Sequence, residues 1–252
     1  MTDFVKINSE TWDLWANEGS EWTLPISRKE YEKVTSENYT VYLTPTIPVP
    51  HRWLGELKGK RLLGLASGGA QQMPVFSKLG AVCTVLDNSE SQLNSERIVA
   101  EREGYSIEII KGDMTKAFPF RDESFDIIFH PVSNVYVKDV FHIWNECFRV
   151  LKKGGILLSG LDNGISFLFE EDDPLRVRNP LPFDPLTMTE ERRERMIKNG
   201  DGIQFSHTLD EQIGGQLKAG FTLKDIYEDR DREGVNEISK YYPQYFSTLS
   251  VK

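Results

Sequence analysis

The feature of this sequence that most constrains its fold is an apolar run that leads directly into a tight turn of small residues. Residues 61–66 have the composition of a buried strand, the small residues 67–69 follow, and a helix is expected over 70–79. A second apolar run, 82–87, then ends in Asp87. Strand, turn, helix and strand in this order are typical of a parallel sheet with crossover helices on its faces.

The alternation of strands and helices continues through most of the chain. Further elements are expected as strands at 106–111, 125–130 and 156–160 and as helices at 89–103 and 138–151. After a helix at 209–219, the two final strands, 221–228 and 245–251, are expected to pair antiparallel at a sheet edge. The sequence thus predicts an α/β fold: a Rossmann-like, mostly parallel sheet of seven strands, flanked by helices, with the last strand antiparallel.

Two segments depart from this alternation. Residues 1–50 are rich in aromatic side chains and prolines, and we interpret them as an N-terminal helical lid, with a short helix that starts near Ser9. Residues 51–252 form the predicted main domain. Within it, residues 162–205 carry acids, bases and prolines but little apolar periodicity, so we interpret them as an insertion that covers the ligand site.

The charge and composition of the chain exclude several classes of partner. With 30 Lys and Arg against 39 Asp and Glu, the net charge is −9 and no basic block is present, which disfavours nucleic acid and anionic membranes. No apolar run approaches about 18 residues, so we expect a cytoplasmic protein without a membrane partner. Cys83 and Cys147 lie in apolar settings and the four histidines are scattered, so neither a disulfide nor a metal site is expected. These patterns do not specify an oligomeric state.

Three segments at the predicted strand ends carry the candidate ligand site. They are the small-residue turn 66–70, Asp87, and the run Gly112, Asp113 and Met114. Each has a plain alternative, because a tight connection, a helix N-cap and an ordinary turn use the same residue types. All three follow consecutive strands, however, and open α/β sheets bind ligands at the carboxyl ends of their parallel strands. Their joint placement indicates a cofactor that contains adenosine, with the ribose hydroxyls at Asp87.

The spacing of the glycines argues against a dinucleotide. The fingerprint G-x-G-x-x-G places a helix N-terminus against a pyrophosphate. Here Gly64 is followed by Ala66, and Gly68 directly by Gly69, so the spacing does not match. A nicotinamide-dependent oxidoreductase is therefore disfavoured, and a cofactor without phosphate is favoured.

These segments resemble the motifs of the class I S-adenosylmethionine-dependent methyltransferases, in the group that includes small-molecule and quinone-biosynthesis enzymes. The resemblance is close over 58–160 and looser over 206–252. It rests on five matches to family motifs: 62–70 with the glycine-rich motif, 85–87 with the ribose motif, 112–114 with the adenine-contacting segment, 118–128 with the stretch LPF…D-x-SFD, and 146–155 with the signature E-x-x-R-V-L-K-x-G-G.

The resemblance implies S-adenosylmethionine as the cofactor, a small molecule as the methyl acceptor, and transfer by in-line displacement. It implies cofactor contacts from Ala66, Ser67, Gly68, Gly69, Gln71, Asp87, Asn88, Gln92, Gly112, Asp113, Met114 and His130. In the family, the loop that follows the strand 125–130 faces cofactor and acceptor, which implies catalytic roles for His130 and Asn134 and acceptor contacts from Ser133 and Tyr136. His207, just before a predicted helix, is a further catalytic candidate, and Trp15 of the aromatic lid is a further candidate for contact with the acceptor. The two histidines also have structural interpretations, one as a hydrogen-bonded side chain at a strand end and the other as part of a capped helix start.

The match departs from the family at the first motif. The family usually has an acid where Gly64 stands and glycines where Ala66 and Ala70 stand. We expect the alanines to fit on the assumption that a positive φ is not required there. We also expect the amides of Gln71 and Gln72 to replace some of the lost polar contacts. These departures keep a second hypothesis open, that of a non-catalytic protein that binds S-adenosylmethionine, such as a sensor.

Overall fold

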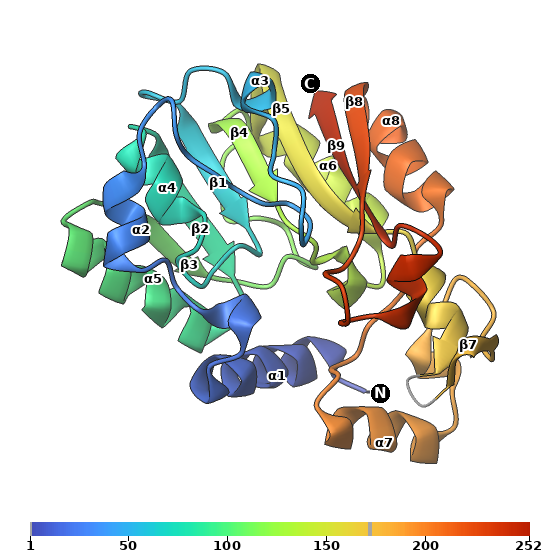
Figure 1. Cartoon of the computed structure of the whole chain (residues 1–252). Helices are drawn as coiled ribbons and strands as arrows, with labels where there is room; N and C mark the ends of the chain where they lie inside the picture. The colour runs from blue at the N-terminus through green and yellow to red at the C-terminus, as the bar shows by residue number, and fades with distance from the viewer. Residues whose placement is uncertain (1, 171–172) are drawn as a thin grey trace.

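A mixed sheet of seven strands organises the protein. The computed structural model describes residues 2–170 and 173–252 and orders the strands β3-β2-β1-β4-β5-β9-β8 (Figure 1). The strands are β1 Arg61–Leu65, β2 Val82–Asp87, β3 Glu108–Lys111, β4 Phe125–His130, β5 Leu151–Asp162, β8 Thr222–Asp229 and β9 Tyr245–Val251. β1 to β5 pair parallel, whereas β9 lies antiparallel between β5 and β8. The predicted fold class is confirmed, including the antiparallel pair at the edge.

Helices cover both faces of this sheet. They are α1 Phe4–Glu18, α2 Arg28–Lys33, α3 His51–Leu54, α4 Met73–Lys78, α5 Glu90–Glu103, α6 Val140–Val150, α7 Glu190–Asn199 and α8 Gly215–Ala219. Because the central strands are buried on both faces, successive residues of a strand enter two separate cores. On β1, Leu62 packs in the core that contains Phe76 of α4, and Leu63 packs in the core that contains Trp144 of α6.

Capping residues fix where the crossover helices begin and end. The side chain of Ser89 accepts the N–H of Gln92 at the start of α5, and Gly104 ends that helix in the left-handed conformation. The side chain of Asp139 accepts two N–H groups at the start of α6. These caps place the loops that follow β2 and β4 at the same edge of the sheet.

The N-terminal helix α1 lies across the carboxyl ends of the parallel strands (Figure 1). It begins at Phe4, because the side chain of Asp3 accepts the N–H of Lys6, and the predicted start near Ser9 is therefore wrong. The chain then returns to the sheet, since residues such as Val41 belong to the core that contains α4.

Two predicted boundaries are wrong in ways that affect the site. β5 continues past residue 160 to Asp162, which pairs with Tyr245 of β9. α4 begins at Met73 and not at 70, because Ala70 has a left-handed φ of 55°. The first change moves an acid to the carboxyl end of a strand, where the sequence does not predict one.

The segment predicted as an insertion contains regular structure of its own. It holds the short hairpin of β6 Phe169–Glu170 and β7 Asp173–Val177, followed by α7, while residues 171 and 172 lie outside the described part of the chain. The helix predicted at 209–219 begins with a π-helical turn, Asp210–Gly214, before α8.

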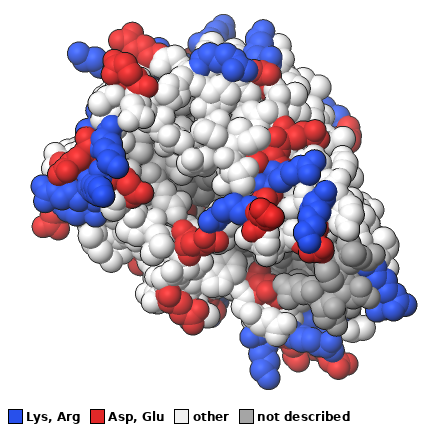
Figure 2. Space-filling view, in the orientation of Figure 1, with Lys and Arg blue, Asp and Glu red and all other residues white. Residues whose placement is uncertain are grey.

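Charged side chains of both signs are interspersed on the face of the molecule shown in Figure 2. Across residues 2–170 and 173–252, no helix has both the length and the hydropathy that crossing a bilayer requires.

Candidate active site

The loop after β1 is held in place by the half-buried carboxylate of Asp87 and the buried carboxylate of Glu96. The N–H of Gly68 donates to Oδ2 of Asp87 at 2.9 Å, and the N–H of Ala70 donates to Oε1 of Glu96 at 2.8 Å. Asp87 is also bonded on its other oxygen, Oδ1, by the N–H of Ser89 at 2.9 Å. Burial raises the pKa of Asp87, and these backbone N–H groups oppose that rise. The loop and the end of β2 are therefore one rigid unit.

Both alanines of the first motif have the backbone conformation that glycine would adopt. φ is 47° at Ala66 and 55° at Ala70, so the expectation that positive φ is not required there is wrong. The left-handed conformation costs an alanine roughly 1–2 kcal/mol. The hydrogen bonds of the loop hold it, because the N–H of Ala66 donates to the carbonyl oxygen of Leu86 at 2.8 Å.

The position where the family usually has an acid is filled by a neighbouring side chain. A Cβ on Gly64 would lie 2.6 Å from Sδ of Met73, which is fully buried. A larger residue at Gly64 therefore requires Met73 to move. The glycine stands where the family has an acid because the Met73 side chain occupies the space that an acid would need.

The amides of Gln71 and Gln72 bind the N-terminal segment. Nε2 of Gln71 donates to the carbonyl oxygens of Trp22 and Leu24, at 2.8 and 3.2 Å. Oε1 of Gln72 accepts the N–H of Tyr42 at 3.1 Å. Each side-chain amide is thus hydrogen-bonded to the chain's own backbone, Gln71 through its nitrogen and Gln72 through its oxygen.

Glu96 is a buried carboxylate without a cationic partner among the described residues. It is fully buried on α5, and its Oε2 has no hydrogen-bond partner. Burial raises its pKa to about 8, and the negative charge of Asp87 adds to the rise. The native state therefore keeps a proton on Glu96 in a pH range where the unfolded chain releases it.

We expect the free energy of unfolding to decrease as pH rises from about 4.5 to about 8, because over this range the unfolded chain releases the proton that Glu96 keeps in the native state. Glu96→Gln should remove the contribution of Glu96 to this decrease. The native pKa is raised from 4.5 to about 8, so the native state binds the extra proton between these values and ionisation costs stability as pH rises. Glutamine keeps an oxygen for the N–H of Ala70. At pH 8 the variant should be more stable than the parent by a few kcal/mol.

Urea unfolding of both proteins from pH 5 to 9 measures this effect. Glu101→Gln, an exposed change on the same helix, is the matched control and should leave the pH dependence of the parent intact. An unaltered pH slope in Glu96→Gln would contradict the assignment of the proton to Glu96.

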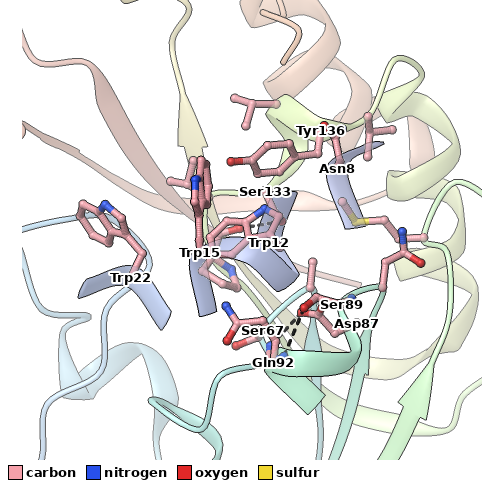
Figure 3. A pocket seen from close by; sticks show the side chains of 18 of the residues that line it. Asn8, Trp12, Trp15, Trp22, Ser67, Asp87, Ser89, Gln92, Ser133 and Tyr136 are labelled. Carbon is pink, nitrogen blue, oxygen red and sulfur yellow. Dashed lines mark hydrogen bonds between the residues drawn. The ribbon is translucent and has the colours of Figure 1, made fainter. Parts of the chain in front are cut away.

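A cavity of about 720 Å³ lies between the carboxyl ends of the strands and α1 (Figure 3). The predicted cofactor contacts that line it are Ala66, Ser67, Gly68, Gln71, Asp87, Asn88, Gln92, Gly112, Asp113 and Met114. Two predicted contacts, Gly69 and His130, are not part of its lining.

Two residues of the cavity lining carry buried polar atoms that are left unsatisfied by the described part of the chain. These atoms are Oγ of Ser67 and Oε1 of Gln92. A Cβ on Gly68 would lie 3.0 Å from Oδ2 of Asp87, and a Cβ on Gly112 would lie 2.5 Å from Cδ1 of Leu86. The glycines thus pack against the chain's own side chains where a Cβ would not fit. The unsatisfied polar atoms favour a polar ligand at this end of the cavity.

His130, Asn134 and His207, the predicted catalytic residues, form a buried network outside the lining of the cavity. Nδ1 of His130 lies 3.0 Å from the carbonyl oxygen of Leu65, and its Nε2 lies 2.8 Å from Oδ1 of Asn134. Nε2 of His207 lies 3.0 Å from the carbonyl oxygen of Asn134. Burial lowers the pKa of both histidines. The geometry therefore favours a structural role, joining the ends of β1 and β4, over contact with reacting atoms.

The predicted capping box before α8 is confirmed. The N–H of Thr208 donates to Oε2 of Glu211 at 2.7 Å, and the N–H of Glu211 donates to Oγ1 of Thr208 at 3.2 Å. This helix start places His207 in the buried network.

Aromatic side chains of α1 form the wall opposite Asp87 (Figure 3). The rings of Trp12 and Trp15 meet edge to face with centroids 5.0 Å apart, and Trp12 meets Tyr136 in the same way at 5.8 Å. The predicted acceptor contacts Trp15, Tyr136 and Ser133 all line the cavity. α1 thus closes the space that the strand ends leave open.

Sequence reasoning missed three residues at the far end of the cavity. Asp162, the last residue of β5, lines it together with Asp231 and Tyr245. The signal for Asp162 is the one that identified Asp87, an acid at the carboxyl end of a strand, but the predicted strand stops at residue 160. Across the described ranges, no group of three acids, histidines or cysteines is arranged to hold a metal ion.

Comparison with known proteins identifies the family. The family profile described as a methyltransferase domain matches residues 63–159. The uncharacterized methyltransferase YbaJ of Bacillus subtilis is 42% identical over 257 residues, which span the whole of both chains. The chain belongs to the S-adenosylmethionine-dependent methyltransferases. The enzyme's methyl donor is therefore S-adenosylmethionine, as the resemblance implies.

More distant relatives of this methyltransferase show how far the likeness extends. A sterol 24-C-methyltransferase of Aspergillus fumigatus is 29% identical over 195 residues, which cover 75% of this chain but only 46% of that protein. The solved structure of an S-adenosylmethionine-dependent methyltransferase from Mesorhizobium loti has a TM-score of 0.59 at 18% identity, covering 80% of this chain and 94% of that one. The structural likeness shows the shared fold.

Proposed function

We propose that this methyltransferase transfers the methyl group of S-adenosylmethionine to a small molecule bound in the cavity under α1. The observation that carries the proposal is the continuity of one cavity, which runs from Asp87 and Asp113 at the strand ends to the aromatic wall of α1. Donor and acceptor can therefore be held side by side in a single enclosed space.

The strand-end half of the cavity supplies the donor contacts. When bound, S-adenosylmethionine supplies a sulfonium methyl group that a nucleophile displaces in line. Asp87 is placed to accept hydrogen bonds from ribose hydroxyls, and Asp113 with Met114 is placed to contact adenine. The Oγ of Ser67, which has no partner in residues 2–170 and 173–252, would bond the methionine part of the donor. The bonds from Gly68 and Ser89 hold the Asp87 carboxylate in position before any ligand binds.

The α1 half of the cavity supplies the acceptor contacts. Trp12 and Trp15 exclude water from the space above the donor, and a dry pocket prevents loss of the methyl group to solvent. We retain the interpretation of the N-terminal segment as a lid on this basis. The size of the cavity, about 720 Å³ shared between two ligands, suits a small acceptor. The sterol methyltransferases among the relatives provide a precedent for a small-molecule acceptor.

Calorimetry followed by an acceptor screen tests the proposed function. S-adenosylhomocysteine should bind the purified protein in the micromolar range. Incubation with S-adenosylmethionine and a panel of amines, hydroxyl compounds and thiols should then release S-adenosylhomocysteine above the acceptor-free background, as measured by mass spectrometry.

The two remaining outcomes separate the alternatives. Tight binding without turnover on any acceptor class would support the non-catalytic sensor. Absence of binding would contradict both hypotheses, because each requires the donor site.

A further inference from the structure

Two carboxylates and a tyrosine meet at the end of the cavity farthest from Asp87. Asp162 ends β5 and pairs in register with Tyr245 of β9, whose hydroxyl donates to Oδ2 of Asp231 at 3.3 Å. Asp162 is 9% exposed, and only its Oδ1 accepts a hydrogen bond within the described chain, from the N–H of Gly164 at 2.6 Å. Because the residue lines the cavity, its second oxygen is left for a ligand.

The charges around the cavity are almost all negative. The charged residues of its lining are the acids Glu21, Asp87, Asp113, Asp162 and Asp231 and one cation, Arg232. The Arg232 guanidinium is 2.7 Å from a carboxylate oxygen of Glu21 and 4.9 Å from the ring centroid of Trp22, so its charge is already engaged. Neither lysine nor histidine is present in that lining. An acceptor that reacts as an anion, such as a phenolate or a thiolate, would be repelled here.

The aromatic wall favours the opposite charge. Trp12, Trp15 and Tyr136 line the same cavity as the two aspartates. The faces of tryptophan and tyrosine attract cations, and ammonium groups are recognised by such faces together with carboxylates. A cationic ligand is therefore favoured by three features of the cavity: the unengaged carboxylate oxygen, the excess of negative charge and the aromatic wall.

We propose that the methyl acceptor is a protonated amine, that Asp162 and Asp231 bind it, and that Asp162 takes its proton. This inference rests on the proposed function and specifies its acceptor. An N–H bond of the ammonium breaks, and the proton passes to the carboxylate of Asp162. The freed nitrogen lone pair forms a bond to the methyl carbon, and the electron pair of the broken carbon–sulfur bond stays on sulfur. The products are the methylated ammonium and S-adenosylhomocysteine.

The surroundings of Asp162 suit it to this task. Burial raises its pKa to about 7, and the negative charge of Asp231 adds to the rise. The hydroxyl of Tyr245 donates to Asp231. Arg230 and Arg232 flank Asp231 in the sequence, and Arg230 donates to the carbonyl oxygen of Ser239 at 3.0 Å. A base whose pKa lies near neutral pH accepts a proton and releases it again at physiological pH.

Paired probes that differ only in charge test the proposal. Binding of tryptamine and of tryptophol, in which a hydroxyl replaces the amine, is measured by calorimetry on the full-length protein saturated with S-adenosylhomocysteine. Benzylamine and benzyl alcohol form a second pair. We expect each amine to bind at least about tenfold more tightly than its alcohol, the effect of a hydrogen bond to a charged group.

Variants locate the preference. Asp162→Asn retains an oxygen for the N–H of Gly164 and should reduce the amine preference about tenfold or more, with affinity for S-adenosylhomocysteine unchanged. Asp210→Asn removes an exposed acid that pairs with Lys218 and should change neither quantity. Asp231→Asn should weaken amine binding in the same direction as Asp162→Asn.

The outcomes distinguish this proposal from the proposed function. Equal affinity for amine and alcohol in both pairs would overturn the amine assignment while leaving the methyltransferase intact. An amine preference that survives Asp162→Asn would overturn the role of Asp162. If Asp162→Asn instead weakens S-adenosylhomocysteine, the residue belongs to the donor site and the proposal fails. Absence of S-adenosylhomocysteine binding by the parent protein would contradict the proposed function itself.

Discussion

Asp87→Ala is expected to lower the affinity for S-adenosylhomocysteine by at least about a hundredfold. The proposed function gives Asp87 two hydrogen bonds from the ribose hydroxyls. Hydrogen bonds to a charged acceptor contribute roughly 1.5–3 kcal/mol each, and the substitution would remove both. It also frees the N–H groups of Gly68 and Ser89, which the carboxylate holds at 2.9 Å, so the loop loses its shape as well. Isothermal titration of the parent and the variant measures the difference.

An acid at the opposite edge of the sheet is the matched control. Asp126 lies on β4, accepts the N–H of Arg61 at 2.9 Å and pairs with Lys152 at 3.0 Å, remote from the carboxyl ends of the strands. Asp126→Asn should leave the affinity within about twofold of the parent. Equal losses in the two variants would show that folding, and not the ribose contact, causes the effect.

Gly160→Ala is expected to destabilise the fold by about 3 kcal/mol or more. A Cβ at this position would lie 2.0 Å from the carbonyl oxygen of Leu43 and 2.7 Å from its carbonyl carbon. That oxygen also accepts the N–H of Val132, so the N-terminal segment cannot withdraw without breaking a second contact. Overpacking of this kind typically costs about 1–3 kcal/mol where side chains can adjust. The cost is larger where the obstacle is backbone, which adjusts less easily.

Urea unfolding of Gly160→Ala beside Ser159→Ala isolates the clash. Ser159 is the fully buried neighbour on β5, and its Oγ has no hydrogen-bond partner, so its removal should change stability by less than about 1 kcal/mol. A Gly160→Ala protein as stable as the parent would show that the segment around Leu43 yields easily.

The fold, and the set of strand-end residues that line the cavity, were predictable because they depend on contiguous sequence. An apolar run that is followed by Asp87, or by Gly112 and Asp113, indicates both a buried strand and the residue at which that strand ends. Because neighbouring parallel strands end at the same edge of the sheet, these residues are expected to lie close together. The same reasoning explains why the antiparallel edge pair was predicted correctly.

Other features in and around the cavity were not predictable in the same way, because they depend on tertiary contacts. β5 continues to Asp162 because β9 pairs with it there. From the local sequence alone, Gly160 indicates the end of a strand. The positive φ of Ala66 and Ala70 contradicts their local preference and is held by hydrogen bonds that their N–H groups donate to acceptors on β2 and α5. The burial of His130 likewise depends on partners distant in sequence, such as the carbonyl of Leu65.

The helix that closes the cavity is bonded to the same loop that presents Asp87. Ser9 donates to the carbonyl oxygen of Asn88 at 2.8 Å, and the side chain of Asn88 donates to the carbonyl oxygen of Val5 at 3.1 Å. Asp13 accepts the hydroxyl of Ser89 at 2.6 Å. We therefore expect α1 and the loop after β2 to open together in local unfolding. At the proposed donor site, local unfolding of the helix should weaken donor binding, and a bound donor should in turn slow the fraying of the helix, because such coupling is reciprocal.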